Sequence, residues 1–374
     1  MEGLAYWVAF ARIPLMTPAR FRLLEGAFGS LEEAWRADAS RLRGAGLEPP
    51  VVDAILHARA RIDPFQELET LHHWGATALT WHDTAYPRRL KEIRETTDVP
   101  PVLFVQGNLQ PQDDRALAVV GTRQATPYGL EACRLLTRAL VEEGFTIVSG
   151  LAQGIDACAH QTALEAGGRT IAVVAGGLDR LYPQQHRFLA RRIATQGAVL
   201  TEYPLGTRPE PFQFHRRNRI LSGLAWGVLV VEAPLESGAM STVQWALSQG
   251  REVFAVPGPI TSPASAGTHR LIQEGAKLVT QVQDILEELR LETPAVQPFL
   301  LEPSPPASPP SSAVRDEASL VLEALGTEAM HIDDLRRRTG LPMPVVSATL
   351  TMLEVSGRVR QVGGMHFVRT DSAR

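Results

Sequence analysis

The segment Gly121–Gly129 combines residue types that would bind an anion. Thr126 is a favoured N-cap residue and Pro127 suits the first position of a helix, so a helix is predicted to begin here. The backbone N–H groups at such a helix start have no partner within the helix and favour phosphate. Arg123 would add a positive charge beside the same anion. A purely structural capped turn would have the same residues.

Six apolar runs, each followed by a Gly-rich turn, indicate how this segment is positioned. They are Leu117–Gly121, Thr146–Gly150, Ile171–Gly177, Ala198–Gly206, Val228–Gly238 and Glu252–Gly258. Helix-period segments separate the runs, and this alternation predicts an α/β fold with a doubly wound, mostly parallel, Rossmann-like sheet. Ligands of such sheets bind beyond the carboxyl ends of the strands. The Gly-rich turns are therefore expected to form a ligand-binding edge.

Composition excludes several classes of protein. With 374 residues we expect two or three domains, and the net charge of −4 gives no general attraction to nucleic acid. Two cysteines argue against a disulfide framework and a cysteine-rich zinc site, and we expect no metal. Without a long apolar stretch or an N-terminal signal pattern, we expect a cytoplasmic protein with no membrane contact. The motifs G-x-G-x-x-G and GK[ST] are absent, so neither a Rossmann dinucleotide site nor a Walker A loop is predicted.

Four segments are predicted along the chain. Residues 1–75 form a helical module that resembles a SAM or helix-hairpin-helix domain, and residues 76–290 form the α/β domain. Residues 291–314 are rich in Pro and Ser and are expected to be a linker. Residues 315–374 form a winged helix, with three helices and a hairpin that turns at Gly363-Gly364.

Two features of the flanking segments bear on DNA binding. The stretch LRGAGLEPPVVDAIL in the helical module resembles a helix-hairpin-helix turn that would hold DNA phosphates, or else a plain packing module. The third winged-helix segment, Pro342–Ser356, has no Lys or Arg. The equivalent helix usually reads the major groove, so an auxiliary or protein-interaction role is favoured for the winged helix.

The second and third turns add candidate residues. The second turn contains Gly150 and continues into a predicted helix with Asp156 and His160, for which capping and packing are favoured over metal or acid–base chemistry. The third turn contains Gly177 and is followed by Tyr182. On a surface that binds single strands this ring would stack on a base, although a packed Tyr before a proline would also explain it.

The segment 187–219 is locally basic in an acidic chain. It has seven Arg against two Glu, and Phe212, Phe214 and His215 are interleaved with the last Arg cluster. Basic residues interleaved with aromatic ones are typical of single-stranded nucleic-acid binding. Arg216–Arg219 is expected to lie directly before an apolar helix on the ligand side of the sheet. The candidates for DNA contact in this segment are Arg187, Arg208, Arg217, Asn218 and Arg219.

The last two turns predict a pocket. The turn that begins at Glu232 leads into a helix through Ser237 and Gly238, with Thr242 one turn further on. The next strand ends near Gly258. Neighbouring helix starts lined by Gly, Ser and Thr would suit a nucleotide or phosphate.

Taken together, these motifs resemble the DNA-processing protein A (DprA, or Smf) family over about residues 80–290. The matching segments are GTRxxTPYG, SGLAQGIDxxAH, GGLDxLYP, FxxRNRILSGL, VVEAPLESGAMST and GREVFAVPG. The resemblance implies a dimeric, non-enzymatic protein that binds single-stranded DNA, protects it and helps to load the RecA recombinase during natural transformation. No catalytic residue and no cofactor are implied.

The resemblance also assigns residues. Arg123, the glycines Gly121, Gly150 and Gly177, and Arg217-Asn218-Arg219 correspond to the family's DNA-binding positions. Thr122 stands where the family commonly has Ser. Gln184 stands where it often has a basic residue, a charge that Arg180 or Arg187 would replace. Helices over 238–249 and 267–274 are candidates for the dimer and RecA surfaces.

Two alternatives remain open. In the first, the chain is a nucleotide-processing enzyme of the phosphoribohydrolase type, in which Glu232 and Glu236 act on a glycosidic bond. In the second, it is a transcription factor with an α/β sensor, against which the absence of Lys and Arg in the third helix of the winged helix argues. The enzyme would need turnover of a nucleoside monophosphate that depends on these carboxylates. The mediator would need salt-sensitive binding that depends on Arg123 and Arg217.

Overall fold

The computed structural model describes residues 2–93, 99–290, 313–326, 329–363 and 365–370. The chain divides into two compact units, Met1–Thr293 and Pro294–Arg374. Most of the predicted linker, residues 291–312, lies outside the described residues. None of the described helices is long and apolar enough to cross a membrane.

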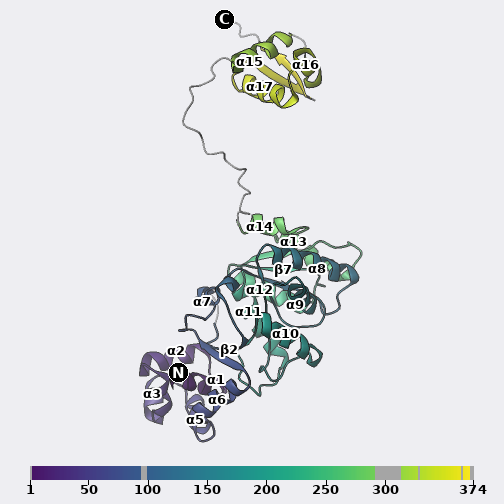
Figure 1. Ribbon diagram of the computed structural model, residues 1–374. Coiled ribbons are helices and arrows are strands. Elements are labelled where there is room, and N and C mark those ends of the chain that lie inside the picture. The colour runs from purple at the N-terminus through teal and green to yellow at the C-terminus, as the bar shows by residue number, and fades with distance from the viewer. Residues whose placement is uncertain (1, 94–98, 291–312, 327–328, 364, 371–374) are drawn as a thin grey trace. The chain divides into compact units, whose positions relative to one another are not determined.

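The first unit begins with six helices (Figure 1). They are α1 (Glu2–Ala11), α2 (Pro18–Phe28), α3 (Leu31–Arg36), α4 (Ala39–Gly44), α5 (Pro49–Arg59) and α6 (Pro64–His73). The predicted signals act as expected at α2 and α3. Gly29 ends α2 in the left-handed conformation, and the Ser30 hydroxyl accepts the amide of Glu33 at 3.1 Å to cap α3.

The turn between α4 and α5 leads into a helix start that is poor in phosphate donors. Helix α5 begins with Pro49 and Pro50, neither of which has an N–H group, and Glu48 takes the N-cap position. A negative charge at a helix start that lacks two donors repels phosphate. The structure thus favours the plain packing module.

A nine-stranded sheet follows, in the order β1-β2-β6-β5-β4-β3-β7-β8-β9. The neighbouring strands from β6 through β5, β4, β3, β7 and β8 to β9 are all parallel. Beyond β6, strand β2 pairs antiparallel with β6, and β1 pairs antiparallel with β2. The strands are β1 (Ala76–Thr80), β2 (Val102–Gly107), β3 (Ala116–Val120), β4 (Thr146–Ser149), β5 (Thr170–Val173), β6 (Ala198–Thr201), β7 (Gly227–Val230), β8 (Glu252–Ala255) and β9 (Lys277–Leu278). The predicted doubly wound sheet is confirmed.

Helices cover both faces of this sheet (Figure 1). Side chains alternate along β3, so Leu117 and Val119 join one apolar cluster while Ala118 and Val120 join the other. The helices and turns are α7 (Arg88–Glu92), α8 (Pro127–Glu142), α9 (Ile155–Glu165), α10 (Arg187–Gln196), α11 (Pro211–Leu224), α12 (Gly238–Ser248), α13 (Ala266–Gln273), α14 (Val282–Glu288) and the short 3-10 turns η2 (Pro111–Asp114), η3 (Gln184–His186) and η4 (Pro263–Ser265).

The winding direction reverses between β3 and β7. Strands β4, β5 and β6 follow one another on one side of β3, and β7, β8 and β9 follow one another on its other side. The turns after β3 and β7 therefore diverge and leave a crevice at the carboxyl ends of these strands.

Two local expectations were wrong. Arg216–Arg219 does not precede a helix but lies inside α11, which already begins at Pro211. Pro is well suited to the first position of a helix. Asp156 does not cap α9, because Gly154 takes the N-cap position and the Asp156 carboxylate instead accepts N–H groups from the preceding turn.

The second unit is a winged helix, as predicted. Its elements are α15 (Ala313–Ala324), β10 (Met330–His331), α16 (Ile332–Thr339), α17 (Met343–Val355), β11 (Val359–Gly363) and β12 (His366–Arg369). Strands β11 and β12 form the expected antiparallel hairpin, whose predicted turn includes residue 364, outside the described residues. The short β10 adds a third strand that the sequence did not suggest.

Candidate functional site

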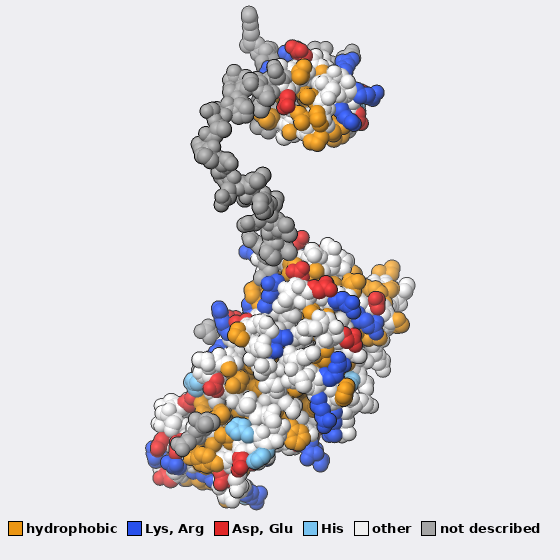
Figure 2. Space-filling model, in the orientation of Figure 1, with side chains coloured by type: hydrophobic (Ala, Val, Ile, Leu, Met, Phe, Trp, Pro, Cys, Tyr) orange, Lys and Arg blue, Asp and Glu red, His pale blue; other side chains and the backbone are white. Residues whose placement is uncertain are grey.

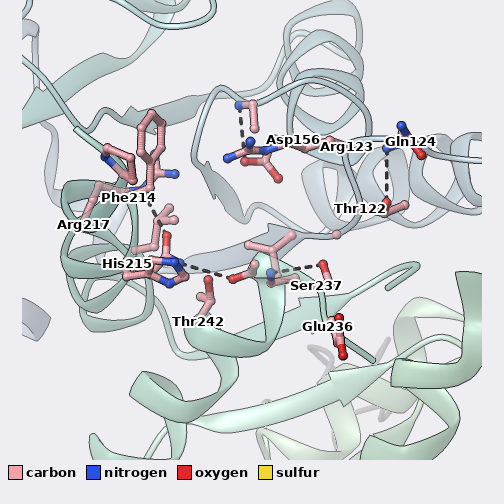
Figure 3. Close-up of a pocket in the computed structure, with 18 of the residues that line it drawn as sticks. Thr122, Arg123, Gln124, Asp156, Phe214, His215, Arg217, Glu236, Ser237 and Thr242 are labelled. Atoms are coloured by element: carbon pink, nitrogen blue, oxygen red, sulfur yellow. Dashed lines mark hydrogen bonds between the residues drawn. The ribbon is translucent and has the colours of Figure 1, made fainter. Parts of the chain in front are cut away.

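A cavity of about 770 Å³ lies where the sheet reverses its winding. The turn after β3, helix α11 and the start of α12 form its walls. Figure 3 shows the labelled side chains of these elements arranged around one space. The predicted site residues that line it are Gly121, Thr122, Arg123, Tyr182, Arg217, Asn218, Ser237, Gly238 and Thr242. Residues of the first, third and fifth predicted turns and of α11 are thus brought together.

Hydrogen bonds to Glu232 stabilise the turn after β3. The Thr126 amide and hydroxyl donate to the two carboxylate oxygens of Glu232, at 2.8 and 2.7 Å. The Thr126 hydroxyl in turn accepts the amide of Gly129 at 3.1 Å, which confirms the predicted cap. A side chain at Gly129 would collide with the Glu232 carboxylate.

Glu232 is therefore a positioning residue of this turn. Its side chain is buried, and it is not among the residues that line the cavity. Glu236, the other carboxylate of the enzyme alternative, is exposed and does line the cavity.

Asp156 and Arg217 hold the turn after β4 from two sides. The Asp156 carboxylate accepts the amides of Gly150 and Ala152 at 3.1 and 3.4 Å. The Arg217 guanidinium donates to the carbonyls of Gly150, at 2.8 Å, and Val173. A Cβ atom at Gly150 would lie 2.5 Å from the guanidinium, so this close approach requires glycine. The backbone beside the cavity is thereby fixed.

Both charged groups are strongly desolvated. Burial lowers the pKa of Arg217 to about 10, although the nearby Asp156 carboxylate opposes this effect. Burial raises the pKa of Asp156, which the Arg217 charge and the two amides partly offset. A guanidinium with a pKa of about 10 stays charged at neutral pH, so Arg217 contributes a fixed positive charge to the cavity wall.

Aromatic rings stand at the edge of the cavity beside Arg123. The Arg123 guanidinium lies over the Phe214 ring at 5.7 Å from its centre, and the Tyr182 ring meets Phe214 edge-to-face at 5.8 Å. Tyr182 is 55% exposed, so it is not the packed residue of the alternative interpretation. These three side chains also border a second, small cavity of about 60 Å³ next to Gly150.

Several predicted residues lie elsewhere. Arg219 is buried and pairs with Glu202 at 2.5 Å, away from the cavity. Gly177 approaches the backbone of Pro204, where a side chain would collide. The remaining residues outside the two cavity linings are Arg187 and Arg208, which are exposed, and Gly258, which lies near Tyr128 and Ser265.

The cavity also contains residues that were not proposed as its members. Gln124, His215, Pro209 and Pro211 line it, as does Phe214, which the sequence marked only as part of a basic and aromatic segment. The pair Glu210-Pro211 is a recognisable helix start. Placing α11 there from the sequence would have put Phe214 and Arg217, three residues apart, on the same face of one helix.

His160 is not exposed to the cavity. It is fully buried on α9, its Nδ1 atom lies 2.6 Å from the Thr170 hydroxyl, and burial lowers its pKa to about 3. No group of three His, Cys, Asp or Glu side chains suited to a metal ion occurs among the described residues. The structure thus gives His160 the packing role favoured by the sequence.

The comparisons with known proteins cover nearly the whole chain. Residues 77–290 match the family model of DNA recombination-mediator protein A, and residues 303–365 match the DprA winged helix domain. Protein Smf of Synechocystis is 35% identical over 98% of both chains.

Two solved structures are similar as well. DNA processing protein A of Streptococcus pneumoniae superimposes with a TM-score of 0.66 at 35% identity, over 76% of this chain and 97% of that one. DNA processing protein A of Helicobacter pylori, whose structure describes single-stranded DNA binding, gives 0.51 at 30% identity, over 57% of this chain and 95% of that one.

Proposed function

The chain belongs to the DNA recombination-mediator protein A family, and from this premise we propose that its 770 Å³ cavity binds single-stranded DNA. The relative from Helicobacter pylori binds single-stranded DNA, and the matched region of this chain contains all the residues that form the cavity. Within the family, this activity belongs to DNA processing during transformation.

One observation carries the proposal: a cation and two aromatic rings are grouped at the cavity edge. Arg123 offers an exposed guanidinium to a phosphate, while Phe214 and the half-exposed Tyr182 offer ring faces and edges to bases. Bases of a single strand can stack on such rings, whereas those of a duplex are already paired and stacked. We therefore expect a preference for single strands.

The proposed site residues fall into two roles. Thr122, Arg123, Tyr182, Ser237, Gly238 and Thr242 line the cavity and are proposed to contact DNA. Arg217 and Asn218 also line it, but their side-chain donors are engaged with backbone and neighbouring polar atoms. We propose that they position the site, together with Gly121, Gly150, Gly177, Arg219, Glu232 and Gly258. Arg208 is proposed to contact DNA outside the cavity.

We propose that binding occurs without catalysis. The enzyme alternative needs two carboxylates at the ligand, and Glu232 is instead occupied by the Thr126 amide and hydroxyl. Glu236 alone faces the cavity. Release of base from nucleoside monophosphates that is lost in Glu236→Gln would support the enzyme instead.

The wider cellular role is also a proposal. In a recombination mediator that protects incoming DNA, the bound strand would be handed to RecA in the cytoplasm, and the protein would act as a homodimer through its α/β domain. We propose the domain division 1–75, 76–290 and 315–374, with a linker at 291–314. Stimulation of RecA filament formation on protected single strands would test the mediator role directly.

The first experiment compares a fluorescent oligo-dT with a matched duplex across a salt series. We expect tight binding of the single strand that weakens with salt, and an affinity about tenfold lower in Arg123→Ala. Arg134→Ala, an exposed arginine on α8, is the matched control. Equal affinity for both DNA forms, or no effect of Arg123→Ala, would refute the assigned site.

A further inference from the structure

Helix α10 has an exposed face that its packing does not explain. Ala190 and Ile193 are buried against the sheet, while Arg187, Phe188 and Arg191 point to solvent. Phe188 is 72% exposed, although burial of a phenylalanine ring normally stabilises a protein. The exposed face thus presents an aromatic ring together with two guanidinium groups.

The positive charge of this face is not neutralised. Among the described residues, no carboxylate lies within ion-pair distance of Arg187 or Arg191, and α10 contains no acidic residue. Arg187 occupies the first turn, where the helix dipole already disfavours a cation. Figure 2 shows Lys and Arg side chains gathered over the region of α10. An anionic partner would relieve this repulsion.

The face is continuous with the cavity edge. The small cavity beside Gly150 shares Tyr182 with the main cavity and extends to Gln153. The Gln153 side-chain amide donates a hydrogen bond to the side-chain carbonyl of Gln185 at 3.4 Å. Gln185 belongs to η3, the turn that directly precedes Arg187. A strand that leaves the main cavity past Tyr182 would reach α10 over this short path.

We propose that single-stranded DNA continues from the cavity past Tyr182 onto α10, where Arg187 and Arg191 bind phosphates and Phe188 stacks on a base. This inference rests on the proposed function and extends it to a second contact surface. Arg187 and Arg191 are one helical turn apart, about 6 Å along the axis, which suits successive phosphates of an extended strand. An acidic protein segment would satisfy the two charges but would not need the exposed ring on the same helix.

The test uses the full chain and two oligo-dT lengths, about 5 nucleotides for the cavity alone and about 20 for the extended path. In the double variant Arg187→Ala/Arg191→Ala, we expect the long strand to bind roughly 10- to 100-fold more weakly at low salt. The slope of the logarithm of the binding constant against the logarithm of the salt concentration, here called the salt slope, should fall in magnitude by about 1.4. Each phosphate contact on single strands contributes about 0.7 to this slope. The short strand should bind as it does to the wild type.

Phe188 gives an independent readout. Phe188→Ala should weaken the long strand about 5- to 100-fold without changing the salt slope, and Phe188→Trp should restore binding. The matched control is Arg134→Ala/Arg138→Ala on α8, two exposed arginines at the same spacing. All these side chains are exposed, so unchanged thermal unfolding should confirm that the variants fold.

The outcomes separate this inference from the proposed function. Unchanged long-strand affinity in both α10 variants would overturn the second surface, while short-strand binding that depends on Arg123 would leave the cavity assignment intact. An equal loss for both lengths would also overturn it, because α10 would then act on the cavity itself. If the short strand does not bind the wild type, the proposed function fails and the extension fails with it.

Discussion

Arg217 and Arg123 line the same cavity, yet their surroundings differ in almost every respect. Arg217 is buried and donates to two backbone carbonyls, whereas Arg123 is exposed and lies over a ring. Arg217 belongs to a buried layer with Asp156 and Glu232, which fixes the backbone of the turns. Arg123, Tyr182 and Phe214 form an exposed rim.

The comparison teaches that residue type alone does not assign a role in a binding site. Buried charges with engaged hydrogen bonds are costly to remove because their partners are left unpaired. Exposed charges cost little stability when removed but act directly on a ligand. We therefore expect substitutions in the buried layer to lower the free energy of unfolding, and substitutions in the rim to lower the affinity for DNA.

The largest effect is expected for Arg217→Ala. The substitution leaves the carbonyls of Gly150 and Val173 without their donor and leaves Asp156 without its opposing charge. We expect a loss of about 3 to 5 kcal/mol in the free energy of unfolding, measured with denaturant. Arg216→Ala, at the partly exposed neighbouring arginine, should lose less than about 1 kcal/mol. Equal losses in the two variants would contradict the buried layer.

The next effect belongs to the rim. Tyr182→Ala should weaken oligo-dT binding by about 1 to 3 kcal/mol through lost base stacking, with the free energy of unfolding nearly unchanged because the ring is half exposed. Tyr182→Phe retains the ring and should bind as the wild type does. Titration of the labelled strand by fluorescence anisotropy measures both variants. A Tyr182→Phe defect as large as that of Tyr182→Ala would show that the hydroxyl, not stacking, matters.

Acid should lower the stability of the folded protein through the buried His160. Burial lowers the pKa of His160 to about 3, from 6.5, so the unfolded chain takes up a proton that the folded chain does not. This contribution is complete above pH 6.5 and is lost as the pH falls toward 3. We expect about 1.4 kcal/mol less stability at pH 5.5 than at pH 7.5, and His160→Gln should lack this part of the decline. Parallel stability–pH curves for the two proteins would contradict the prediction.

The smallest effect concerns the cap. Thr126→Val removes the hydroxyl that joins the Glu232 carboxylate to the amide of Gly129. We expect a loss of about 1 kcal/mol in the free energy of unfolding, and Thr126→Ser should retain most of the stability. Since the half-buried Thr126 does not line the cavity and its hydroxyl is directed to Glu232, affinity for DNA, corrected for the folded fraction, should stay within about twofold of the wild type.

The sequence predicted the sheet and the position of the cavity better than the orientation of individual side chains. Strand ends and the Thr126 cap depend on local apolar runs and on well-known cap residues, which are readable without a structure. Counting charges located the basic segment but could not show that Arg217 and Arg219 point inward. That orientation depends on where α11 begins, and the helix begins at Pro211.

The buried layer joins residues that are far apart in the sequence and are therefore synthesised at different times during translation. Thr126 and Glu232, which hold the first turn together, are separated by 106 residues, and Arg217 follows Gly150 by 67. During translation, the turn after β3 emerges well before β7 exists, so its supporting carboxylate is still missing. A nascent or truncated chain that ends before α12 would carry Arg123 but no complete cavity. Domains generally fold as units once their chain is available, so the protein is expected to gain DNA-binding ability late in its own synthesis, in a single step.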